Sequence, residues 1–401
     1  MSVAWSCSDR VGWGCLEYRG PAAENPSRNG KSGPIPRTPL VCPSGFASHD
    51  LPPQAPQTAI LIILFSRKMA GGIALVTGAN GFVGCHVVRA LLARGTHVRA
   101  LVRPNADRRT LDGLDCEFAV GDLRDPEAVE RAVRGCDEVY HVAADYRLWV
   151  LDEAAMYGTN VEGTRNVIKA AHAARVHRII HTSTVGTLGI GAEGLGREDT
   201  PVTLDAMVGP YKRSKFLAEQ EAVKAAKAGI PVVIVNPSTP IGRYDYKPTP
   251  TGRIIVDFLN RRMPAYVDTG LNLVAVEDCA RGHLLAAEHG RIGEKYILGC
   301  ENLTLKEMLL RLSGLSGLAA PRIRLPFVMA LAYAFGAETV ARTFTHRPPR
   351  ASLTEVRMAR KKMFFDSAKA RAELGYETAP IDDALKRAIK FFRLSGLART
   401  A

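Results

Sequence analysis

The stretch IALVTGANGFVG, residues 73–84, decides the fold of this chain. It begins with a short apolar run, as expected for a strand that is buried on both faces of a parallel sheet. Gly78, Gly81 and Gly84 follow, and then an amphipathic segment with helical spacing. A helix that begins at such a turn presents unpaired N–H groups and the positive end of its dipole. The stretch therefore predicts a strand, a tight turn and a helix that together hold a pyrophosphate group.

Strand and helix patterns continue to alternate after this first unit. Further strands are predicted at residues 96–103, 116–120, 138–142 and 178–183, with helical patterns between them, the longest at 157–175. Such alternation is typical of an α/β fold with a doubly wound parallel sheet. We expect an NAD(P)-binding Rossmann domain at residues 69–240 and a smaller C-terminal domain, mainly substrate-binding, at residues 241–401.

Residues 1–68 differ from the rest of the chain. They contain nine of the 24 prolines and three of the eight cysteines, and no periodic apolar pattern. Such a segment cannot bury enough apolar surface to offset the entropy lost on ordering. Its apolar run at 59–65 is too short to span a bilayer. We expect a non-native upstream extension, because the first strand begins just after Met69, or else a natural disordered tail.

The formal charge of +13 restricts the classes of partner. From residue 340 onward there are fourteen Lys/Arg and six Asp/Glu, but no single basic stripe of the kind that binds nucleic acid. A solvated basic surface is the main interpretation, and an acidic substrate or an anionic membrane surface is the alternative. The cysteines form no CxxC pair and have no histidines at zinc spacing. We therefore expect a reducing, cytoplasmic location, no metal and no disulfide.

The end of the second strand indicates which dinucleotide binds. Sites specific for NAD place a carboxylate there, about twenty residues past the glycines, to bond the ribose 2′-hydroxyl. Val102 and Arg103 occupy that place in this chain. A guanidinium pairs with a 2′-phosphate, and Arg99 should share the strand face of Arg103, because residues four apart point to the same side. We expect NADP(H), with NAD(H) as the alternative if Arg103 is only a solvated surface residue.

Two further positions follow strands where a dinucleotide would lie. Asp122 and Leu123 follow the third strand, where Asp122 could reach the adenine, although a turn alone also explains an aspartate here. Ala143 and Ala144 follow the fourth strand, and their small side chains would let a cofactor approach closely.

A tyrosine and a lysine carry the predicted chemistry. GPYKRSK, residues 209–215, opens an alanine-rich helix, so Tyr211 and Lys215 project from one face on successive turns. A free tyrosine has a pKa of about 10, and a nearby ammonium would favour the phenolate by about 1.4 kcal/mol for each unit of pKa depression. We expect Tyr211 to be the acid–base group, while a hydroxyl at the end of the fifth strand, residues 182–184, holds the substrate oxygen.

From Met69 onward the chain resembles an extended short-chain dehydrogenase/reductase of the NAD-dependent epimerase/dehydratase type. TGANGFVG, GDLRD and YKRSK resemble the glycine-rich, adenine-side and YxxxK motifs of that family. The resemblance implies that Thr184, Tyr211 and Lys215 are the catalytic residues and places Pro237 and Ser238 beside the nicotinamide. Together with the positions argued above, the predicted cofactor site comprises Gly78, Gly81, Phe82, Val83, Gly84, Arg103, Asp122, Leu123, Ala143, Ala144, Tyr211, Lys215, Pro237 and Ser238. It also implies that Asn160 steadies the helix near the active site.

Five segments resemble a narrower bacterial group, the hopanoid-associated sugar epimerases, which are similar to dihydroflavonol 4-reductases. These segments are HVAADYRLW, YKRSKFLAEQ, NPSTPIG, PTPTGRIIVDFLN and MPAYVDTGLNLV. Two departures favour a reductase that uses NADPH: Leu188 replaces the tyrosine usual in sugar-nucleotide epimerases, and the second strand lacks its acidic residue. The alternatives are a sugar epimerase, nucleotide- or lipid-linked, that oxidises transiently and retains its cofactor, and a non-catalytic redox sensor.

The C-terminal half suggests substrate and surface contacts. Tyr244, Tyr246, Lys247 and Arg253 lie in a Pro/Gly-rich loop that resembles a substrate loop, with ordinary surface residues as the alternative. The spacing of Thr304 and Glu307 predicts a capping box. The apolar residues 325–335, followed by arginines, predict a helix packed on the substrate domain, or else contact with the inner face of a membrane that would suit a lipid-linked alcohol or ketone.

A homodimer is expected from the family resemblance. The helices at 157–175 and 211–228 would pair with those of a second copy, and their alanines would allow close approach. The apolar residues that suggest this interface are Val161, Val167, Ile168, Leu217 and Val223.

Overall fold

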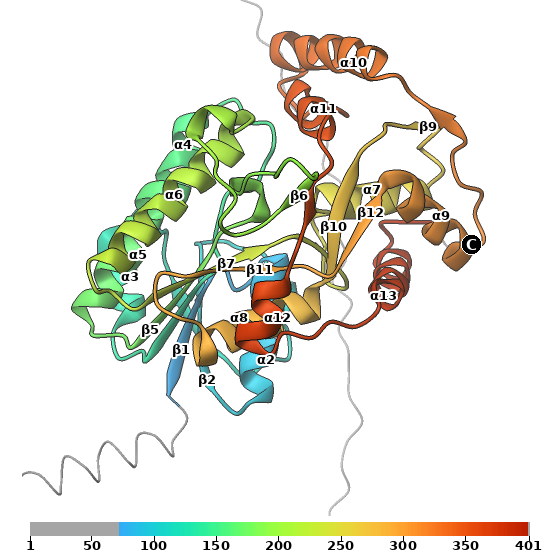
Figure 1. Ribbon diagram of the computed structural model, residues 1–401. Coiled ribbons are helices and arrows are strands. Elements are labelled where there is room, and N and C mark those ends of the chain that lie inside the picture. Colours follow the sequence, from blue (N-terminus) through green and yellow to red (C-terminus); the bar gives the residue numbers. More distant parts are fainter. Residues whose placement is uncertain (1–71, 400–401) are drawn as a thin grey trace, which may run out of the picture. The chain divides into compact units, whose positions relative to one another are not determined.

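Seven parallel strands form the central sheet of the computed structural model, which describes residues 72–399 (Figure 1). Their order is β11-β7-β5-β4-β1-β2-β3. Their bounds are β1 (Ile73–Thr77), β2 (His97–Val102), β3 (Glu117–Val120), β4 (Glu138–His141), β5 (Arg178–Thr182), β7 (Val232–Pro237) and β11 (Lys295–Leu298). The predicted doubly wound parallel sheet is confirmed, whereas the expectation for residues 1–68 lies outside the described residues.

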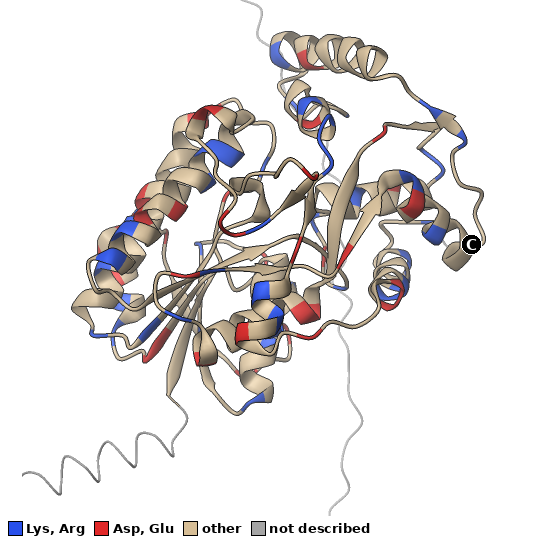
Figure 2. Cartoon of the chain, viewed as in Figure 1, with Lys and Arg blue, Asp and Glu red and all other residues tan. Residues whose placement is uncertain are grey.

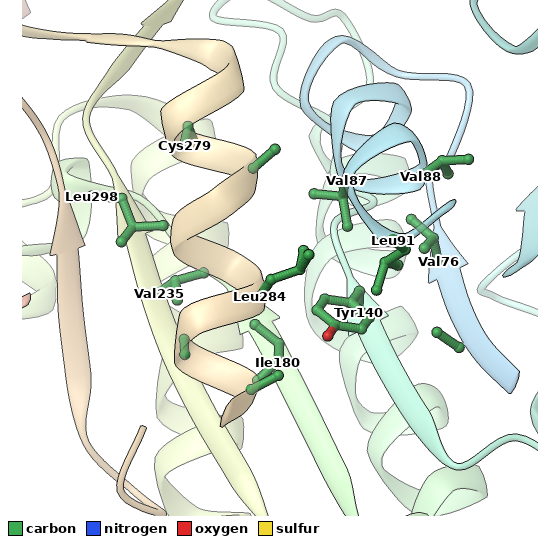
Figure 3. Packing of buried hydrophobic residues seen from close by; sticks show 14 of the residues in the cluster. Val76, Val87, Val88, Leu91, Tyr140, Ile180, Val235, Cys279, Leu284 and Leu298 are labelled. Atoms are coloured by element: carbon green, nitrogen blue, oxygen red, sulfur yellow. The ribbon is translucent and has the colours of Figure 1, made fainter. Parts of the chain in front are cut away.

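Helices cover both faces of this sheet because successive side chains of a strand point to opposite faces. One face packs against α3 (Pro126–Val133), α5 (Gly163–Ala173) and α6 (Gly209–Lys227), and the other against α2 (Phe82–Ala93), α8 (Val276–His289) and α12 (Ala368–Leu374). Leu75 of β1 therefore lies in the first cluster, and its neighbour Val76 lies in the second, beside Val87, Leu91 and Leu284 (Figure 3).

The long helix predicted at 157–175 is a composite. It begins earlier, as α4 (Glu153–Tyr157), and continues through a π-helical turn, Gly158–Glu162, into α5. The Asp152 side chain caps α4 by accepting a hydrogen bond from the Ala155 N–H. Single π turns inside helices often mark functional sites, and this one carries Asn160.

A second, three-stranded sheet forms the core of the C-terminal region. Its strands, in the order β12-β10-β8, pack with three helices, and these elements are β8 (Thr239–Ile241), β10 (Gly270–Ala275), β12 (Glu301–Thr304), α7 (Pro250–Leu259), α9 (Leu305–Ser316) and α13 (Ile381–Leu394). The predicted capping box of Thr304 and Glu307 is confirmed at the start of α9.

Segments after residue 240 return to the Rossmann sheet, so the two regions are not separated at a single point of the sequence. After β10, α8 returns to cover the Rossmann sheet, and β11 then pairs in parallel with β7 at the edge of that sheet. The remaining elements are β6 (Leu195–Gly196), β14 (Phe364–Phe365), β9 (Ala265–Tyr266), β13 (Ile323–Arg324), α10 (Phe327–Val340) and α11 (Leu353–Ala359). Among residues 72–399, no helix has the length and apolar character needed to cross a bilayer.

Candidate cofactor and active site

The glycine-rich turn between β1 and α2 is too tight for side chains. Gly78 has φ +64°, and a Cβ there would lie 2.7 Å from the Cα of Ala143. A Cβ at Gly84 would lie 2.1 Å from the carbonyl oxygen of Gly78. The Gly81 N–H donates to that same carbonyl over 2.9 Å, which closes the turn. Glycine is therefore required here by the packing of the turn against the end of β4.

The N-terminus of α2 is suited to binding an anion. Gly81 is its N-cap, so no side chain caps the helix, and the first turn has no acidic residue. Phe82 and Val83 form that first turn, where N–H groups and the positive dipole end favour phosphate. At the end of β7, the Oγ of Ser238 is buried with no hydrogen-bond partner among the described residues. An uncapped helix and a buried hydroxyl without a partner both fit a dinucleotide.

Arg103 is exposed immediately after β2, where the dinucleotide specificity of the fold is decided. Within residues 72–399 it forms no salt bridge. Asp122 nearby is instead held by Arg124, whose guanidinium chiefly lowers the pKa of that carboxyl, with a smaller contribution from Arg103. The Arg103 guanidinium is therefore free to bind an anionic group.

Arg99 does not share this orientation, and the prediction that it faces the ribose is wrong. Its Nε donates to Glu117 Oε2 over 2.9 Å. Its Nη1 donates to the carbonyl oxygens of Ala132 and Arg134 over 2.8 and 2.7 Å. Arg99 lies near the start of β2, away from the carboxyl end of the sheet where ligands bind in this fold, so its side chain ties β2 to β3 and α3.

The other predicted cofactor positions line the ends of the strands. The backbone N–H of Ala143 donates to Thr77 Oγ1 over 3.1 Å, which fixes the Ala143-Ala144 segment beside β1. Leu123 is buried, and its carbonyl oxygen accepts a hydrogen bond from Asn166. The carboxylate of Asp122 is occupied by Arg124, so adenine contact at this position stays a prediction.

Tyr211, Thr184 and Lys215 come together where β5 meets the first turn of α6. The Thr184 side chain lies close enough to the Tyr211 hydroxyl to act on the pKa of that phenol. The Nζ of Lys215 donates to the carbonyl oxygen of Thr182 over 2.7 Å, and Lys215 is almost fully buried. The Thr184 Oγ1 also accepts a hydrogen bond from the Gly186 N–H. The hydroxyl, phenol and ammonium groups predicted from the sequence are therefore neighbours.

The expected depression of the Tyr211 pKa is wrong for this structure. Burial raises the pKa of Tyr211 to about 12, although the nearby Thr184 side chain acts in the opposite direction. Lys215 directs its ammonium to Thr182 instead of Tyr211, and burial lowers its own pKa to about 8. Tyr211 is therefore protonated at neutral pH and is an acid in its resting state.

Glu219 is a buried carboxylate that the sequence reasoning missed. It lies one turn after Lys215 on α6 and is fully buried. It accepts four hydrogen bonds, from Ser183 Oγ (2.5 Å), Thr187 Oγ1 (2.7 Å), Asn236 Nδ2 (2.8 Å) and Lys295 Nζ (2.5 Å). The spacing of Tyr211, Lys215 and Glu219, each four residues apart, is the signal that could have found it.

This carboxylate also positions Thr184. The Nδ2 of Asn236 donates to Glu219 and to the carbonyl oxygen of Thr184, the latter over 3.0 Å. Thr187 Oγ1 lies 2.7 Å both from the same carbonyl oxygen and from Glu219 Oε2, so its single proton is shared between these two acceptors. Because Glu219 holds both partners of that carbonyl, it fixes the backbone from which the Thr184 hydroxyl projects.

Asn160 fixes the opposite side of α6. Its side chain accepts from the N–H of Asp145 over 2.7 Å and donates to that residue's carbonyl oxygen over 3.0 Å. It also donates to Ser214 Oγ, which in turn donates to the carbonyl oxygen of Tyr211. These bonds are those expected of a residue that steadies the helix near the active site.

Two buried histidines lie behind Lys215 on neighbouring strands. The rings of His141 and His181 are 5.4 Å apart. His141 bonds Thr77 and Thr164, whereas both ring nitrogens of His181 are buried without a partner among the described residues. Burial, aided by the charge of Lys215, lowers the pKa of both rings. Both histidines are therefore neutral at physiological pH.

The loop predicted to contact substrate carries two tyrosines that pack on the core and two basic residues. The rings of Tyr244 and Tyr246 pack against Phe391 of α13, with centroids 6.0 and 5.0 Å apart. The guanidinium of Arg89 stacks over Tyr244 at 4.1 Å. These two tyrosines therefore join the loop to the core, and a substrate contact stays a prediction for Lys247 and Arg253.

The apolar residues on which the dimer prediction relied belong mostly to the core of the chain itself. Val161, Val167 and Ile168 are at most 6% exposed. Apolar residues at helical spacing show that a helix has an apolar face, but they do not show what covers that face. In the structure, Val167 and Ile168 pack in the core cluster with the central sheet. The outer surface of α5 and α6 instead carries Arg165, which pairs with Glu162 and Glu221.

Comparisons with known proteins agree with this geometry. The family model described as the NAD dependent epimerase/dehydratase family matches residues 74–299. The chain is 43% identical over 330 residues to the putative dihydroflavonol 4-reductase of Synechocystis sp., with 81% of this chain and 96% of the relative covered. It is 36% identical over 324 residues to sterol demethylase protein B of Methylococcus capsulatus, with 80% and 99% covered.

A solved structure is also similar. The nucleoside-diphosphate-sugar epimerase from Pseudomonas aeruginosa superimposes with a TM-score of 0.69 and is 31% identical, with 82% of this chain and 99% of that chain covered. The relatives thus include proteins named as a reductase and as an epimerase.

Proposed function

Because this chain belongs to the NAD-dependent epimerase/dehydratase family of extended short-chain dehydrogenases/reductases, enzymes that bind NAD(P), we propose that it is a reductase that consumes NADPH. Its substrate would be a ketone, or a carbinol in the reverse direction. The observation that carries the proposal is the free guanidinium of Arg103 at the end of β2, where an NAD enzyme has a carboxylate.

Residues already described would hold the cofactor. The glycine-rich turn and the N-terminus of α2 would bind the pyrophosphate, and Arg103 would bind the 2′-phosphate. Pro237 and Ser238 would lie beside the nicotinamide, where the unpartnered Ser238 hydroxyl gains a hydrogen bond. When bound, the reduced cofactor supplies the hydride.

Tyr211 would supply the proton. Its raised pKa keeps the phenol protonated, so it can donate to the oxygen of a ketone as that oxygen gains negative charge. Thr184, whose side chain lies near the Tyr211 hydroxyl, would hold the same oxygen. Lys215 lies one turn further along α6, and its ammonium would stabilise the remaining phenolate once it turns from the Thr182 carbonyl toward Tyr211. In the oxidative direction the same groups would remove the proton.

A sugar epimerase is the second candidate, favoured by the similarity to the Pseudomonas aeruginosa enzyme. An epimerase would oxidise its substrate transiently and return the hydride, so its cofactor is retained and shows no net turnover. Either reaction would act on a sugar or on a lipid-linked alcohol or ketone. The sterol in the name of one relative, the dihydroflavonol in another and the resemblance to hopanoid-associated epimerases support a bulky, largely apolar substrate.

Cofactor analysis of the purified full-length protein separates these candidates. Mass spectrometry would identify any retained dinucleotide and co-purifying small molecule, and a panel of sterol ketones, dihydroflavonols and nucleotide sugars would then be assayed. Stoichiometric formation of NADP⁺ with product supports the reductase. Product without net cofactor change, together with tightly retained NAD, would replace it with the epimerase.

We further propose a cytoplasmic homodimer. The five cysteines within the described residues are free thiols, as suits a reducing compartment. A dimer interface on α5 and α6 would use their exposed polar surface, because the apolar residues beneath it are already buried. Sedimentation at micromolar concentration tests this, and a monomeric mass would contradict it.

A further inference from the structure

Helix α10 buries small residues and its one charged residue, and it exposes most of its large apolar residues. Its small residues Ala330 and Ala334 are buried against α11, together with Glu338, the only charged residue of the helix. Glu338 pairs with Arg342 and accepts a hydrogen bond from the Leu353 N–H. The opposite side carries large apolar side chains with high exposed fractions, namely Val328 (75%), Met329 (59%), Tyr333 (55%), Phe335 (63%) and Val340 (49%).

These exposed side chains share the outer side of the helix. At 100° per residue they fall on the half of the helix that faces away from Ala330, Ala334 and Glu338. Phe344, just beyond the helix, is 79% exposed and extends the strip. Monomeric proteins rarely expose contiguous apolar surface of this kind unless it binds something. We refer to residues 328, 329, 333, 335, 340 and 344 as the apolar strip.

The surroundings of the apolar strip are strongly basic. Residues 322–362 contain nine Lys/Arg and two Asp/Glu, a net charge of +7. Figure 2 shows α10 tan over most of its length, with basic positions in the segments before and after it. Arg324 and Arg342 pair with acidic residues. In the described part of the chain, Arg322, Arg347 and Arg350 form no salt bridge.

The same helical hairpin touches the catalytic helix. A Cβ on Gly209, two residues before Tyr211, would lie 2.5 Å from the side chain of Thr354 on α11. The guanidinium of Arg342 lies 5.9 Å from the ring of Trp149, in the loop after β4. The α10–α11 hairpin therefore packs beside the first turn of α6, on which Tyr211 lies.

We propose that α10 docks on an anionic lipid bilayer, with the apolar strip inserted at the boundary between headgroups and acyl chains. An interfacial helix requires large apolar residues on one side and basic residues at the edges, and this segment has both. A second copy of the chain fits less well, because it would bring another +7 segment against the first. An anionic surface attracts this charge instead.

Docking would bring the active site to the membrane surface. The first turn of α6 would then lie close to the headgroups, so that a lipid-soluble ketone could reach Tyr211 without crossing bulk water. This consequence rests on the proposed function, whereas docking itself does not depend on the chemistry at Tyr211.

Vesicle flotation of the full-length protein tests the docking. The probes are vesicles of phosphatidylglycerol and phosphatidylethanolamine, and vesicles of phosphatidylcholine alone. The wild type should bind the anionic vesicles, with affinity falling as salt rises. The double variant Val328→Ser/Phe335→Ser should lose about tenfold or more of this affinity with no loss of thermal stability. Leu310→Ser removes an exposed leucine (53%) on α9, outside the apolar strip; it is the control and should bind as wild type does.

The charges are tested separately. Arg347→Ala/Arg350→Ala should weaken binding to anionic vesicles by roughly fivefold for each arginine, whereas Arg262→Ala, an exposed arginine outside the segment, should have no effect. Failure to bind anionic vesicles, or equal binding to both vesicle types, would overturn the proposal. A dimer that Val328→Ser/Phe335→Ser dissociates would instead assign the strip to a second copy.

The catalytic variant Tyr211→Phe separates docking from chemistry. It should bind vesicles as tightly as wild type while losing turnover, so an inactive but docking wild type would contradict only the proposed function. Normal activity without vesicle binding would contradict only the docking.

Discussion

Helices α6 and α10 depart from ordinary helix amphipathicity in opposite directions. α6 buries Lys215 and Glu219, whereas α10 exposes Val328 and Phe335. The buried charges of α6 have partners: Lys215 bonds the Thr182 carbonyl, and Glu219 accepts four hydrogen bonds. Among residues 72–399, the side of α10 that packs against α11 carries Ala330, Ala334 and Glu338 with the partly buried Phe327 and Leu331, whereas Val328 and Phe335 stay exposed. In this enzyme, whether a side chain is buried therefore depends more on the partners available to that face of the helix than on whether the residue is polar or apolar.

The largest expected effect tests whether the buried polar face of α6 carries the chemistry. Tyr211→Phe should lower kcat about a thousandfold, or roughly 4 kcal/mol, because the ring remains and the proton-donating oxygen is lost. Cofactor affinity should change little, because the packing of the ring is retained. Steady-state kinetics and cofactor titration measure both quantities. Retention of a tenth of the activity would show that another group transfers the proton.

A second test compares two glutamates on the same helix, one buried and one at the surface. Glu219→Gln should lower the free energy of unfolding by about 3 kcal/mol, because it breaks a buried, paired carboxylate. It should also lower kcat/KM, since the Thr184 backbone loses its support. Glu221→Gln removes only a surface pair with Arg165 and should cost at most about 1 kcal/mol. Equal losses in chemical denaturation would mean that the buried network contributes no more than a surface pair.

A third test concerns a charge that is neither buried nor paired. Arg103→Ala should reduce the preference for NADPH over NADH by about ten- to a hundredfold, or 1.5–3 kcal/mol, and leave NADH affinity nearly unchanged. Arg99→Ala is the matched control on the same strand, and it should leave the preference unchanged because its partners are structural. The measurement is the pair of dissociation constants for each variant. Tighter binding of NADH than of NADPH by the wild type would contradict the reductase proposal and favour the epimerase.

A last effect, at most about 1.4 kcal/mol for each pH unit, tests the contrast between buried groups with and without partners. Burial lowers the pKa of His141 to about 3 and that of His181 well below its ordinary value. Because these folded values lie below the unfolded value of about 6.5, the stabilisation is complete above that pH and is lost as the pH falls below it. Each such histidine lowers the free energy of unfolding by up to about 1.4 kcal/mol for each pH unit below this value, and His181→Phe should abolish the contribution of His181. Melting temperatures measured between about pH 7 and pH 4 would show a shallower decline, and an unchanged slope would contradict a buried neutral His181.

Local patterns in the sequence were sufficient for much of the fold and the site. The glycine-rich turn, the alternation of strands and helices and the spacing of Tyr211 and Lys215 all depend on residues close together in the chain. The structure has β1 at Ile73–Thr77 and α6 from Gly209, close to the predicted positions. Thr184 was added through the family resemblance, and in the structure its side chain lies close enough to Tyr211 to act on the pKa of the phenol.

The errors concern contacts between distant residues. Lys295 reaches Glu219 across 76 positions of sequence, and no local spacing indicates such a pair. Arg99 was assigned from its strand face alone, whereas its partners on α3 and β3 decide where its guanidinium points. The sign of the Tyr211 pKa shift depends on burial and on the carbonyl to which Lys215 turns, and both are properties of the folded chain.

Strand β11 makes the Rossmann sheet slow to complete during synthesis. It shields the outer edge of β7, yet it ends at Leu298, far along the chain from the start of β1 at Ile73. At about 5–20 residues per second, a ribosome takes roughly 3–12 s to make the chain from the end of β7 at Pro237 to Leu298. During that time β7, whose residues are all buried in the finished fold, is an open edge of the kind that pairs with other chains. A nascent chain that ends near residue 240 therefore exposes a strand edge that β11 covers in the finished fold.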